Sequence, residues 1–295
     1  MFRNLRMYRL HSDWPESEIL LSNRLQAFAF QPCGTLTERS AGFDEPAPGY
    51  AMLARSVAGA DLLQLREQSR VLPAAAVNEA LEERLEEFQE RMDRPPGRSE
   101  KRDLKEEVFA SLLPRALLKS ERIKLFYLHD EQILGVGVAS EPQAERVLDT
   151  LRLALGSLNV TPLAFETSLS SLIATLYLGK GPSEFTVGRE CRMVEPDGRG
   201  ATVTWSDIEI TDPSIRRHVK DGLKLDRLSL GFGEVMSFVL DEQAVIRKIK
   251  LLGDEMKDEM DEEDPLARLD AQFVVMTGTL RKLVLSLKKN LGGYA

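Results

Sequence analysis

Residues 94–124 read RPPGRSEKRDLKEEVFASLLPRALLKSERIK, a stretch whose prolines and glycine mark out a helical hairpin. The Pro-Pro-Gly sequence at 95–97 ends a helix predicted over 74–92, because proline and glycine are poorly tolerated inside helices. A second helix is expected over 99–113, and Pro114 ends it. The apolar stripe between the two helices is thin and comprises Leu81, Leu85, Phe88, Leu104, Val108 and Leu112. Since most of its surface is charged, the hairpin is expected to stand away from the body of the protein.

The same stretch is basic although the chain as a whole is acidic. It holds nine Lys and Arg residues against five Asp and Glu residues, a formal charge of +4, whereas the whole chain of 295 residues carries −8. The acidity is concentrated in residues 254–264, where eight acidic residues and one lysine give −7, so the remainder is close to neutral. A basic segment on a nearly neutral background indicates a surface that binds a polyanion such as DNA.

A second basic cluster lies around a helix expected at 213–220. Long cationic side chains contact phosphates without reading bases, and few aromatic residues are interleaved for stacking on single strands. We therefore expect binding to the backbone of double-stranded DNA with little sequence preference, and leave single-stranded DNA open. The predicted DNA-binding residues are Arg94, Arg98, Lys101, Arg102, Lys105, Arg115, Lys119, Arg216, Arg217, Lys220, Lys224 and Arg227.

Hairpins and amphipathic helices alternate along the chain without a repeated βαβ pattern, which indicates an α+β fold, with mainly antiparallel sheets and flanking helices. The expected strands are residues 3–10, 50–57, 62–71, 123–129, 132–138, 159–164, 185–194, 201–210, 223–231, 234–240 and 245–252, with a turn at Asp197-Gly198. The further expected helices are residues 15–29, with Asp13 as N-cap and Ile19 and Leu20 on its apolar face, 141–155, 168–178, 213–220 and 266–291, interrupted near Thr277-Gly278. Residues 35–49 are expected to form a loop.

These elements group into three expected regions. Residues 1–72 and 121–165 form a central α+β region, residues 73–120 form the helical hairpin as a tip, and residues 166–295 form a C-terminal α+β base. A chain of 295 residues is long enough for one elaborate domain or for two to three small ones.

Residue types for catalysis or metal binding do not occur in recognisable patterns. The two cysteines, Cys33 and Cys191, are far apart, and the three histidines lack metal-ligand spacing, so no metal site is expected and both thiols are expected to be buried and reduced. The Gly-x-Gly pieces at 179–181 and 231–233 do not continue as phosphate loops. No catalytic residue or cofactor is therefore predicted, and an enzyme is disfavoured.

The N-terminal sequence MFRNLRMYRLHSDW lacks the apolar run of a signal peptide. No window approaches the roughly 20 apolar residues of a membrane span. We expect a cytoplasmic protein without a membrane partner.

Four ordered segments resemble the recombination-associated protein RdgC family. In residues 104–116 the sequence LKEEV is followed by SLLPRA, which looks like the signature of that family. The other segments are FQPCG at 30–34, LGSL at 155–158 with Pro162-Leu163, and LDAQF at 269–273 with MTG at 276–278 and LGG at 291–293. The resemblance therefore covers essentially the whole chain.

The resemblance implies a nucleoid-associated DNA-binding protein that restrains RecA-promoted strand exchange, and a closed, ring-shaped homodimer that DNA can thread. Arg94 and Arg115 match basic positions of the family. Leu117 stands where the family often has an aromatic residue, Leu223 replaces a common lysine, and residues 204–207 are less basic and less amide-rich than in relatives. The expected dimer interface at the tip comprises Leu113, Pro114, Leu117 and Leu118.

Two hypotheses from different classes follow. The first is a dimeric, sequence-independent duplex binder that limits RecA-promoted recombination in the nucleoid. The alternative is a protein-interaction module that acts on a recombination or replication partner without binding DNA itself. The acidic net charge and the charged helical hairpin favour the alternative, and an electrophoretic shift at physiological salt separates the two.

Overall fold

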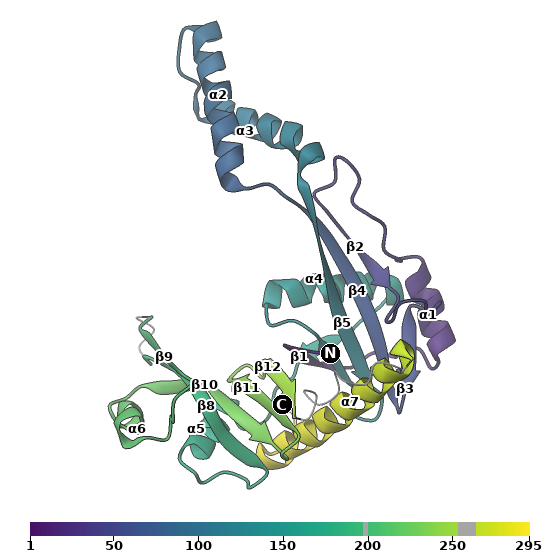
Figure 1. Ribbon diagram of the computed structural model, residues 1–295, viewed down its shortest axis with the longest axis vertical. Helices are drawn as coiled ribbons and strands as arrows, with labels where there is room; N and C mark the ends of the chain where they lie inside the picture. The colour runs from purple at the N-terminus through teal and green to yellow at the C-terminus, as the bar shows by residue number, and fades with distance from the viewer. Residues whose placement is uncertain (197–199, 253–263) are drawn as a thin grey trace. The chain divides into compact units, whose positions relative to one another are not determined.

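The computed structural model describes residues 1–196, 200–252 and 264–295, without the side chain of Lys220 (Figure 1). The predicted turn at 197–198 and all but the last residue of the acidic segment 254–264 therefore lie outside the described residues. Among the described residues, no helix combines the length and the apolar character that crossing a membrane would require.

The predicted α+β class with antiparallel sheets is confirmed. One sheet has seven strands in the order β2-β4-β5-β6-β1-β7, with β3 paired to β4, and a second has five in the order β12-β11-β10-β8-β9. The strands with a described register pair antiparallel. The strands are β1 (Arg6–Leu10), β2 (Arg39–Asp44), β3 (Ala54–Val57), β4 (Ala60–Val71), β5 (Leu117–Leu128), β6 (Ile133–Val136), β7 (Val160–Pro162), β8 (Phe185–Val194), β9 (Thr202–Ser206), β10 (Lys224–Phe232), β11 (Met236–Asp241) and β12 (Ile246–Leu251).

The described residues form seven α-helices and one short 3-10 helix. They are α1 (Glu18–Gln26), α2 (Ala74–Met92), α3 (Arg98–Leu112), η1 (Leu113–Arg115), α4 (Glu141–Leu155), α5 (Leu169–Tyr177), α6 (Pro213–Lys220) and α7 (Pro265–Asn290). The predicted bounds of α2 and α4 agree with the structure.

The chain divides into two compact units. The larger unit comprises Met1–Ala27, Glu45–Gln64 and Lys124–Ala295, and the smaller one, here called the hairpin unit, comprises Phe28–Asp44 and Leu65–Ile123. The expected three-region division of the chain stays a prediction.

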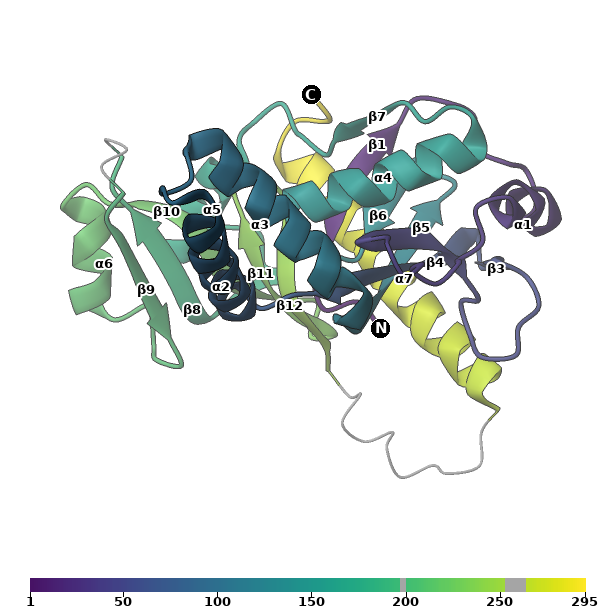
Figure 2. The ribbon, with the colours of Figure 1, turned by 90° about the horizontal axis from the view of Figure 1, so that it is seen from above.

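The core of the larger unit joins α5 and α7 to one face of the five-stranded sheet. Leu228, Leu230 and Phe232 alternate along β10 and are buried against residues of both helices, such as Ile173 and Leu280. Alternation with period two is what a strand with one buried face shows. Both α5 and α7 lie on that face of the sheet (Figures 1 and 2).

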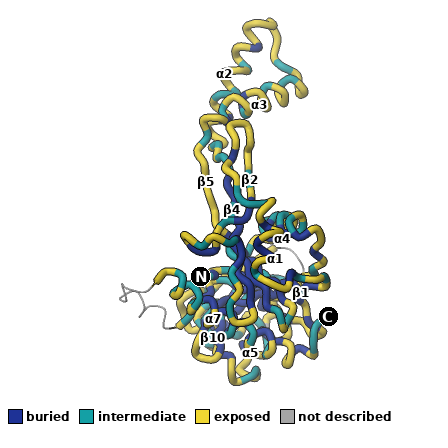
Figure 3. The backbone as a smooth tube through the Cα atoms, turned by 90° about the vertical axis from the view of Figure 1, so that its right-hand side faces the viewer, coloured by how far each residue is buried: buried dark blue, intermediate teal, exposed yellow. Residues whose placement is uncertain are grey.

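The hairpin unit has little buried apolar surface. Val77 and Phe88 are the buried residues of α2, and Val108 is the buried residue of α3, while most other positions of both helices are exposed (Figure 3). The turn between the helices is closed at its end by the Gly97 N–H, which donates to Glu100 Oε2 at 2.8 Å. The predicted apolar stripe is therefore present, and it is thin.

One arginine fastens the end of α3 to a neighbouring loop within the hairpin unit. The Arg70 guanidinium donates to the carbonyl oxygens of Leu113 at 3.2 Å, Pro114 and Ala116 at 3.4 Å, and Gly34 at 3.0 Å. A cation at the C-terminal end of a helix satisfies carbonyl groups that have no intrahelical partner. Pro114 thus ends α3 as predicted, and Arg70 fixes the chain direction that follows.

Three predictions about elements are wrong in detail. Ser17, not Asp13, caps α1, since its hydroxyl accepts the Leu20 N–H at 3.3 Å. Ile19 and Leu20 are 63% and 52% exposed, because Leu21, Ser22 and Leu25 form the buried face of this helix. The helix α7 is unbroken near residue 277, where the Thr277 hydroxyl donates to the Phe273 carbonyl at 2.8 Å within the helix.

The segment predicted as a loop at 35–49 contains β2. Its sequence RSAGFD is poor in residues with strand propensity, but Phe43 is buried and exchanges backbone hydrogen bonds of 2.8 Å with Phe28 and Phe30. Tertiary pairing therefore overrides local propensity here. Likewise β5 begins at Leu117 rather than at residue 123, and its first six residues are exposed.

Candidate nucleic-acid interface

The exposed face of α3 carries four of the predicted DNA-binding residues. Arg98, Lys101, Arg102 and Lys105 follow one another at spacings of three, one and three residues, so three of them stack along one side of the helix. The side chains of Arg98, Lys101 and Lys105 have no hydrogen-bond or ion-pair partner among the described residues. Arg102 is 73% exposed and only 3.7 Å from Asp103 and 3.9 Å from Glu106, and such surface pairs contribute about 0–1 kcal/mol. We call these four residues the α3 basic face.

Arg94 is paired within its own unit, and its predicted contact with DNA stays a prediction. Its guanidinium donates to both carboxylate oxygens of Glu100, at 2.7 and 2.8 Å, and lies over the Phe88 ring at 5.5 Å. The Arg94 hydrogen bond, with the Gly97 N–H, lowers the pKa of Glu100 to about 2. Arg94 therefore closes the turn between α2 and α3, and contact with a ligand would compete with that function.

Arg115 and Lys119 follow the α3 basic face along the chain. Arg115 lies in η1 and Lys119 on β5, and both side chains are exposed without a partner among the described residues. Both belong to the hairpin unit, as the α3 basic face does. Six predicted cations of this unit are thus available to a ligand, with Arg94 as the exception.

Two residues of the second predicted cluster, Arg216 and Lys224, are engaged within the protein. Arg216 donates to the Tyr177 carbonyl at 3.2 Å and lies over its ring at 5.8 Å. Lys224 Nζ lies 2.7 Å from Glu242 Oε2. Arg217 is 78% exposed and 3.6 Å from Asp221, so it remains accessible. The side chain of Lys220 lies outside the described residues, so its place in the cluster stays a prediction.

Arg227 belongs to a group of arginines that sequence reasoning did not find. On the face of the five-stranded sheet away from α5 and α7, Arg227 on β10 is the cross-strand partner of Arg192 on β8, and Arg247 on β12 lies close by. We call Arg192, Arg227 and Arg247 the arginine row. The three residues are far apart in sequence, and only strand pairing brings them together.

An apolar groove and two exposed leucines lie in the hairpin unit. The groove has a volume of about 480 Å³ and an apolar floor of Leu36, Phe109, Ala110 and Leu113. Its rim comprises Glu38, Arg102, Lys105 and Glu106. Of the predicted dimer interface, Leu117 and Leu118 are 80% and 48% exposed and Pro114 is exposed, whereas Leu113 is buried in its own chain.

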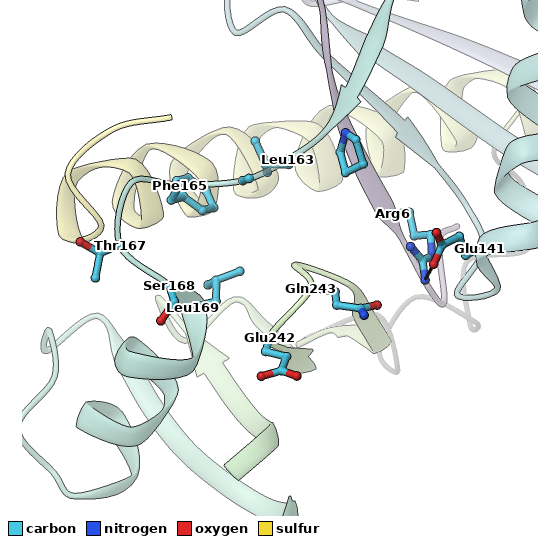
Figure 4. A pocket seen from close by; sticks show the side chains of 11 residues that line it. Arg6, Glu141, Leu163, Phe165, Thr167, Ser168, Leu169, Glu242 and Gln243 are labelled. Atoms are coloured by element: carbon cyan, nitrogen blue, oxygen red, sulfur yellow. Dashed lines mark ion pairs between the residues drawn. The ribbon is translucent and has the colours of Figure 1, made fainter. Parts of the chain in front are cut away.

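A cavity of about 320 Å³ lies in the larger unit between the segment after β7 and the turn that follows β11 (Figure 4). Its walls combine apolar residues such as Leu163 and Phe165 with polar groups. Arg6 and Glu141 form an ion pair of 3.6 Å at one end, and Glu242 lies opposite the apolar wall. Because these charged groups are already paired, the cavity offers no free charge for a ligand.

Two of the histidines, His11 and His129, lie beside polar side chains, and both cysteines are buried. His11 lies 2.9 Å from the Thr161 hydroxyl, and His129 lies 2.9 Å from the buried carboxylate of Asp61. Both cysteines are buried free thiols, as predicted, and burial raises the pKa of Cys191 to about 11. Within the described residues there is no group of three His, Cys, Asp or Glu side chains that could hold a metal ion.

Comparison with known proteins gives matches along nearly the full chain. A family model described as "Putative exonuclease, RdgC" matches residues 1–294. A recombination-associated protein RdgC from Shewanella loihica is 32% identical over 297 residues, covering 99% of this chain and 98% of its own. Proteins of the same name from Shewanella sediminis and Shewanella oneidensis are each 30% identical over 297 residues, covering 99% of this chain and 98% and 97% of their own.

Proposed function

The chain belongs to the RdgC family of recombination-associated proteins, and from this premise we propose that it binds duplex DNA without reading its sequence and thereby limits RecA-promoted recombination. The observation that carries the proposal is the α3 basic face. Three of its four cations have no partner among the described residues, so contact with phosphates would cost no internal ion pair.

The geometry of the α3 basic face fits a phosphate backbone better than base edges. Arg98 and Lys105 are separated by two helical turns, which is about 10 Å along the helix. Duplex DNA carries one negative charge per roughly 1.7 Å of its axis, so the face meets several phosphates at any register. Lysines contribute half of this face, and a lysine ammonium binds phosphate as a point charge without selecting a base.

The proposed molecule is a homodimer whose protruding hairpins meet. Leu117 of one subunit would enter the apolar groove of the other, and the reverse contact would form by symmetry, as a two-fold interface requires. The groove floor of Leu36, Phe109 and Ala110 has the size and apolar character to take a leucine side chain. A closed ring that DNA threads adds topological retention to a modest electrostatic attraction, which suits a chain whose net charge is −8. Such a protein would be located on the nucleoid in the cytoplasm.

The salt dependence of DNA binding tests the proposal. The logarithm of the binding constant should fall linearly with the logarithm of salt concentration, by about 0.9 per phosphate neutralised. Replacing Arg98, Lys101 and Lys105 with alanine should flatten this slope by about 2–3, whereas replacing Arg84, Arg91 and Arg152 removes equal charge elsewhere and should leave it nearly unchanged. An equal effect of the two triple variants would reject the α3 basic face as the site.

The alternative of a protein-interaction module is separated by the same experiment. Absence of a wild-type electrophoretic shift at physiological salt, on duplexes of several sequences, would reject DNA binding and favour the alternative. The family model also carries the word exonuclease, and our expectation of no catalysis stays a prediction. Incubation of end-labelled linear duplex with the protein and Mg²⁺ or Mn²⁺ tests it, since nucleotide release would contradict the expectation.

A further inference from the structure

The arginine row lies across four strands of the five-stranded sheet, on the face away from α5 and α7. Arg192, Arg227 and Asp241 are direct cross-strand neighbours on β8, β10 and β11, so their side chains share one face. A β-bulge follows Leu225 on β10 and brings Asp226 beside Arg227 on that face. Three guanidinium groups and two carboxylates therefore meet there, which leaves one positive charge uncompensated.

Both carboxylates are fully engaged by the outer two arginines and by backbone groups. Arg192 donates through Nε to both oxygens of Asp226 at 2.8 Å, and its Nη2 also contacts that carboxylate. Arg247 Nη2 lies 3.2 Å from Asp241 Oδ2. The other oxygen of Asp241 accepts the backbone N–H groups of Gln243 at 3.0 Å and Val245 at 2.9 Å. Since Asp226 and Asp241 are each only 5% exposed, their hydrogen bonds hold Arg192 and Arg247 in place.

The central arginine of the row has no such partner. The Arg227 side chain forms no hydrogen bond or ion pair with any described residue, and its Nε atom is buried without an acceptor. Burial lowers the pKa of Arg227, and the nearby charges of Arg192 and Arg247 lower it further, against the opposite effect of Asp226 and Asp241. The lowered pKa means that the charged form of the Arg227 guanidinium is less stable in the folded protein than in water, so its positive charge opposes folding.

We propose that the arginine row is a binding site for a single phosphate group, in which Arg227 contacts the phosphate and the fixed Arg192 and Arg247 complete its cradle. A guanidinium presents two parallel N–H donors that match two oxygens of a phosphate, and an anion at this place removes the repulsion among the three cations. Thr204 on β9 is the cross-strand partner of Arg192 and adds a hydroxyl beside the cradle. The inference rests on the proposed function for the source of the phosphate, which is then one phosphodiester of bound DNA.

Thermal unfolding of the full-length protein tests the phosphate site directly. Inorganic phosphate should raise the melting temperature of the wild type above its value in chloride at equal ionic strength. Arg227→Gln should lose this increase, and in chloride it should melt at the same or a higher temperature, because the substitution removes an uncompensated cation. Arg84→Gln, an exposed arginine on α2, is the matched control and should keep the full response to phosphate. A lower melting temperature of Arg227→Gln in chloride, together with an unchanged response to phosphate, would overturn the proposal.

DNA binding separates failure of the phosphate site from failure of the proposed function. On duplex DNA, Arg227→Gln should weaken binding and reduce the salt slope by about 1. Arg227→Lys should restore the salt slope more fully than the affinity, because lysine returns the positive charge but not the two parallel N–H donors of the guanidinium. Stabilisation by phosphate without any DNA binding would keep the site and reject the proposed function. DNA binding that Arg227→Gln leaves unchanged, with phosphate still stabilising that variant, would reject the site and keep the proposed function.

Discussion

The α3 basic face and the arginine row carry the same kind of charge in opposite structural settings. On α3, long side chains extend into solvent from a helix with one buried residue, and their few ion pairs are 3.7 Å or longer. In the arginine row, two arginines are fixed by buried carboxylates beside a densely packed core. Exposed cations such as those of the α3 basic face are suited to attracting a polyanion over a distance. Arginines held in place by carboxylates, as in the arginine row, are suited to positioning a single phosphate. The predictions below test whether the two settings differ as much as their geometry indicates.

The largest expected effect concerns packing beneath the two surfaces. Leu230 on β10 is fully buried, so Leu230→Ala should lower the free energy of unfolding by about 2–5 kcal/mol through lost burial and the cavity it leaves. Leu81→Ala on α2 should cost less than about 1 kcal/mol, because Leu81 is half-buried and alanine favours the helix. Urea unfolding of each variant, followed by circular dichroism, measures both values. Equal losses would mean that the hairpin unit is as tightly packed as the sheet.

The second effect concerns the ion pairs of each surface. Asp226→Ala should destabilise the protein by about 2 kcal/mol, because it leaves Arg192 without its carboxylate beside two other arginines. This is less than the roughly 3–5 kcal/mol of fully buried pairs, since the Arg192 side chain is 30% exposed. Glu106→Ala on α3 should change stability by less than about 0.5 kcal/mol. Urea titration measures the free energy of unfolding of both variants. An Asp226→Ala variant as stable as the wild type would contradict the structural role of the outer arginines.

A third effect concerns the apolar groove beside the α3 basic face. Leu117→Asp should weaken dimerisation about 30-fold or more, or roughly 2 kcal/mol, because a carboxylate would have to be buried in the groove. Leu153→Asp on α4 is the matched control, since Leu153 is 67% exposed and lies in the larger unit. Light scattering over a dilution series measures the mass. A dimer that tolerates Leu117→Asp as well as Leu153→Asp would remove this interface.

The smallest effect is confined to the turn before α3. The pKa of Glu100 is lowered to about 2 by Arg94 and the Gly97 N–H, so its contribution to the turn is complete above the ordinary carboxyl pKa and is lost as pH falls toward 2. A carboxyl titration followed by NMR should give this low midpoint. Arg94→Gln should raise it by about one pH unit or more, because the charged partner is lost. A midpoint that does not move would show that Arg94 is free to bind DNA instead.

The sequence predicted the elements whose boundaries are encoded locally. The bounds of α2 and α4 agree because proline or glycine stands within three residues of each end and their apolar positions recur at helical spacing. The segment that became β2 could not be recognised, because its strand is maintained by pairing with β4 and by backbone hydrogen bonds to residues 28–30 rather than by its own composition.

The α3 basic face was predictable for the same reason, since its cations lie within one helix and their charge density is visible along the chain. The arginine row was not, because Arg192 and Arg247 are distant from Arg227 in sequence and meet it only through strand pairing and a bulge. Nor could charge counting show that Arg94 and Lys224 are already engaged by glutamates. Local sequence therefore indicates where cations occur, and tertiary structure decides which of them remain available.

Arg70 gives the helical hairpin a consequence that extends beyond its own hydrogen bonds. Its guanidinium holds four carbonyl oxygens, three of them at the point where α3 gives way to β5. Without these hydrogen bonds we expect the helix pair to be less rigidly oriented, which would weaken the DNA binding proposed for the α3 basic face. Arg70 would then influence the affinity for DNA through the orientation of α3, although no contact with DNA is proposed for it.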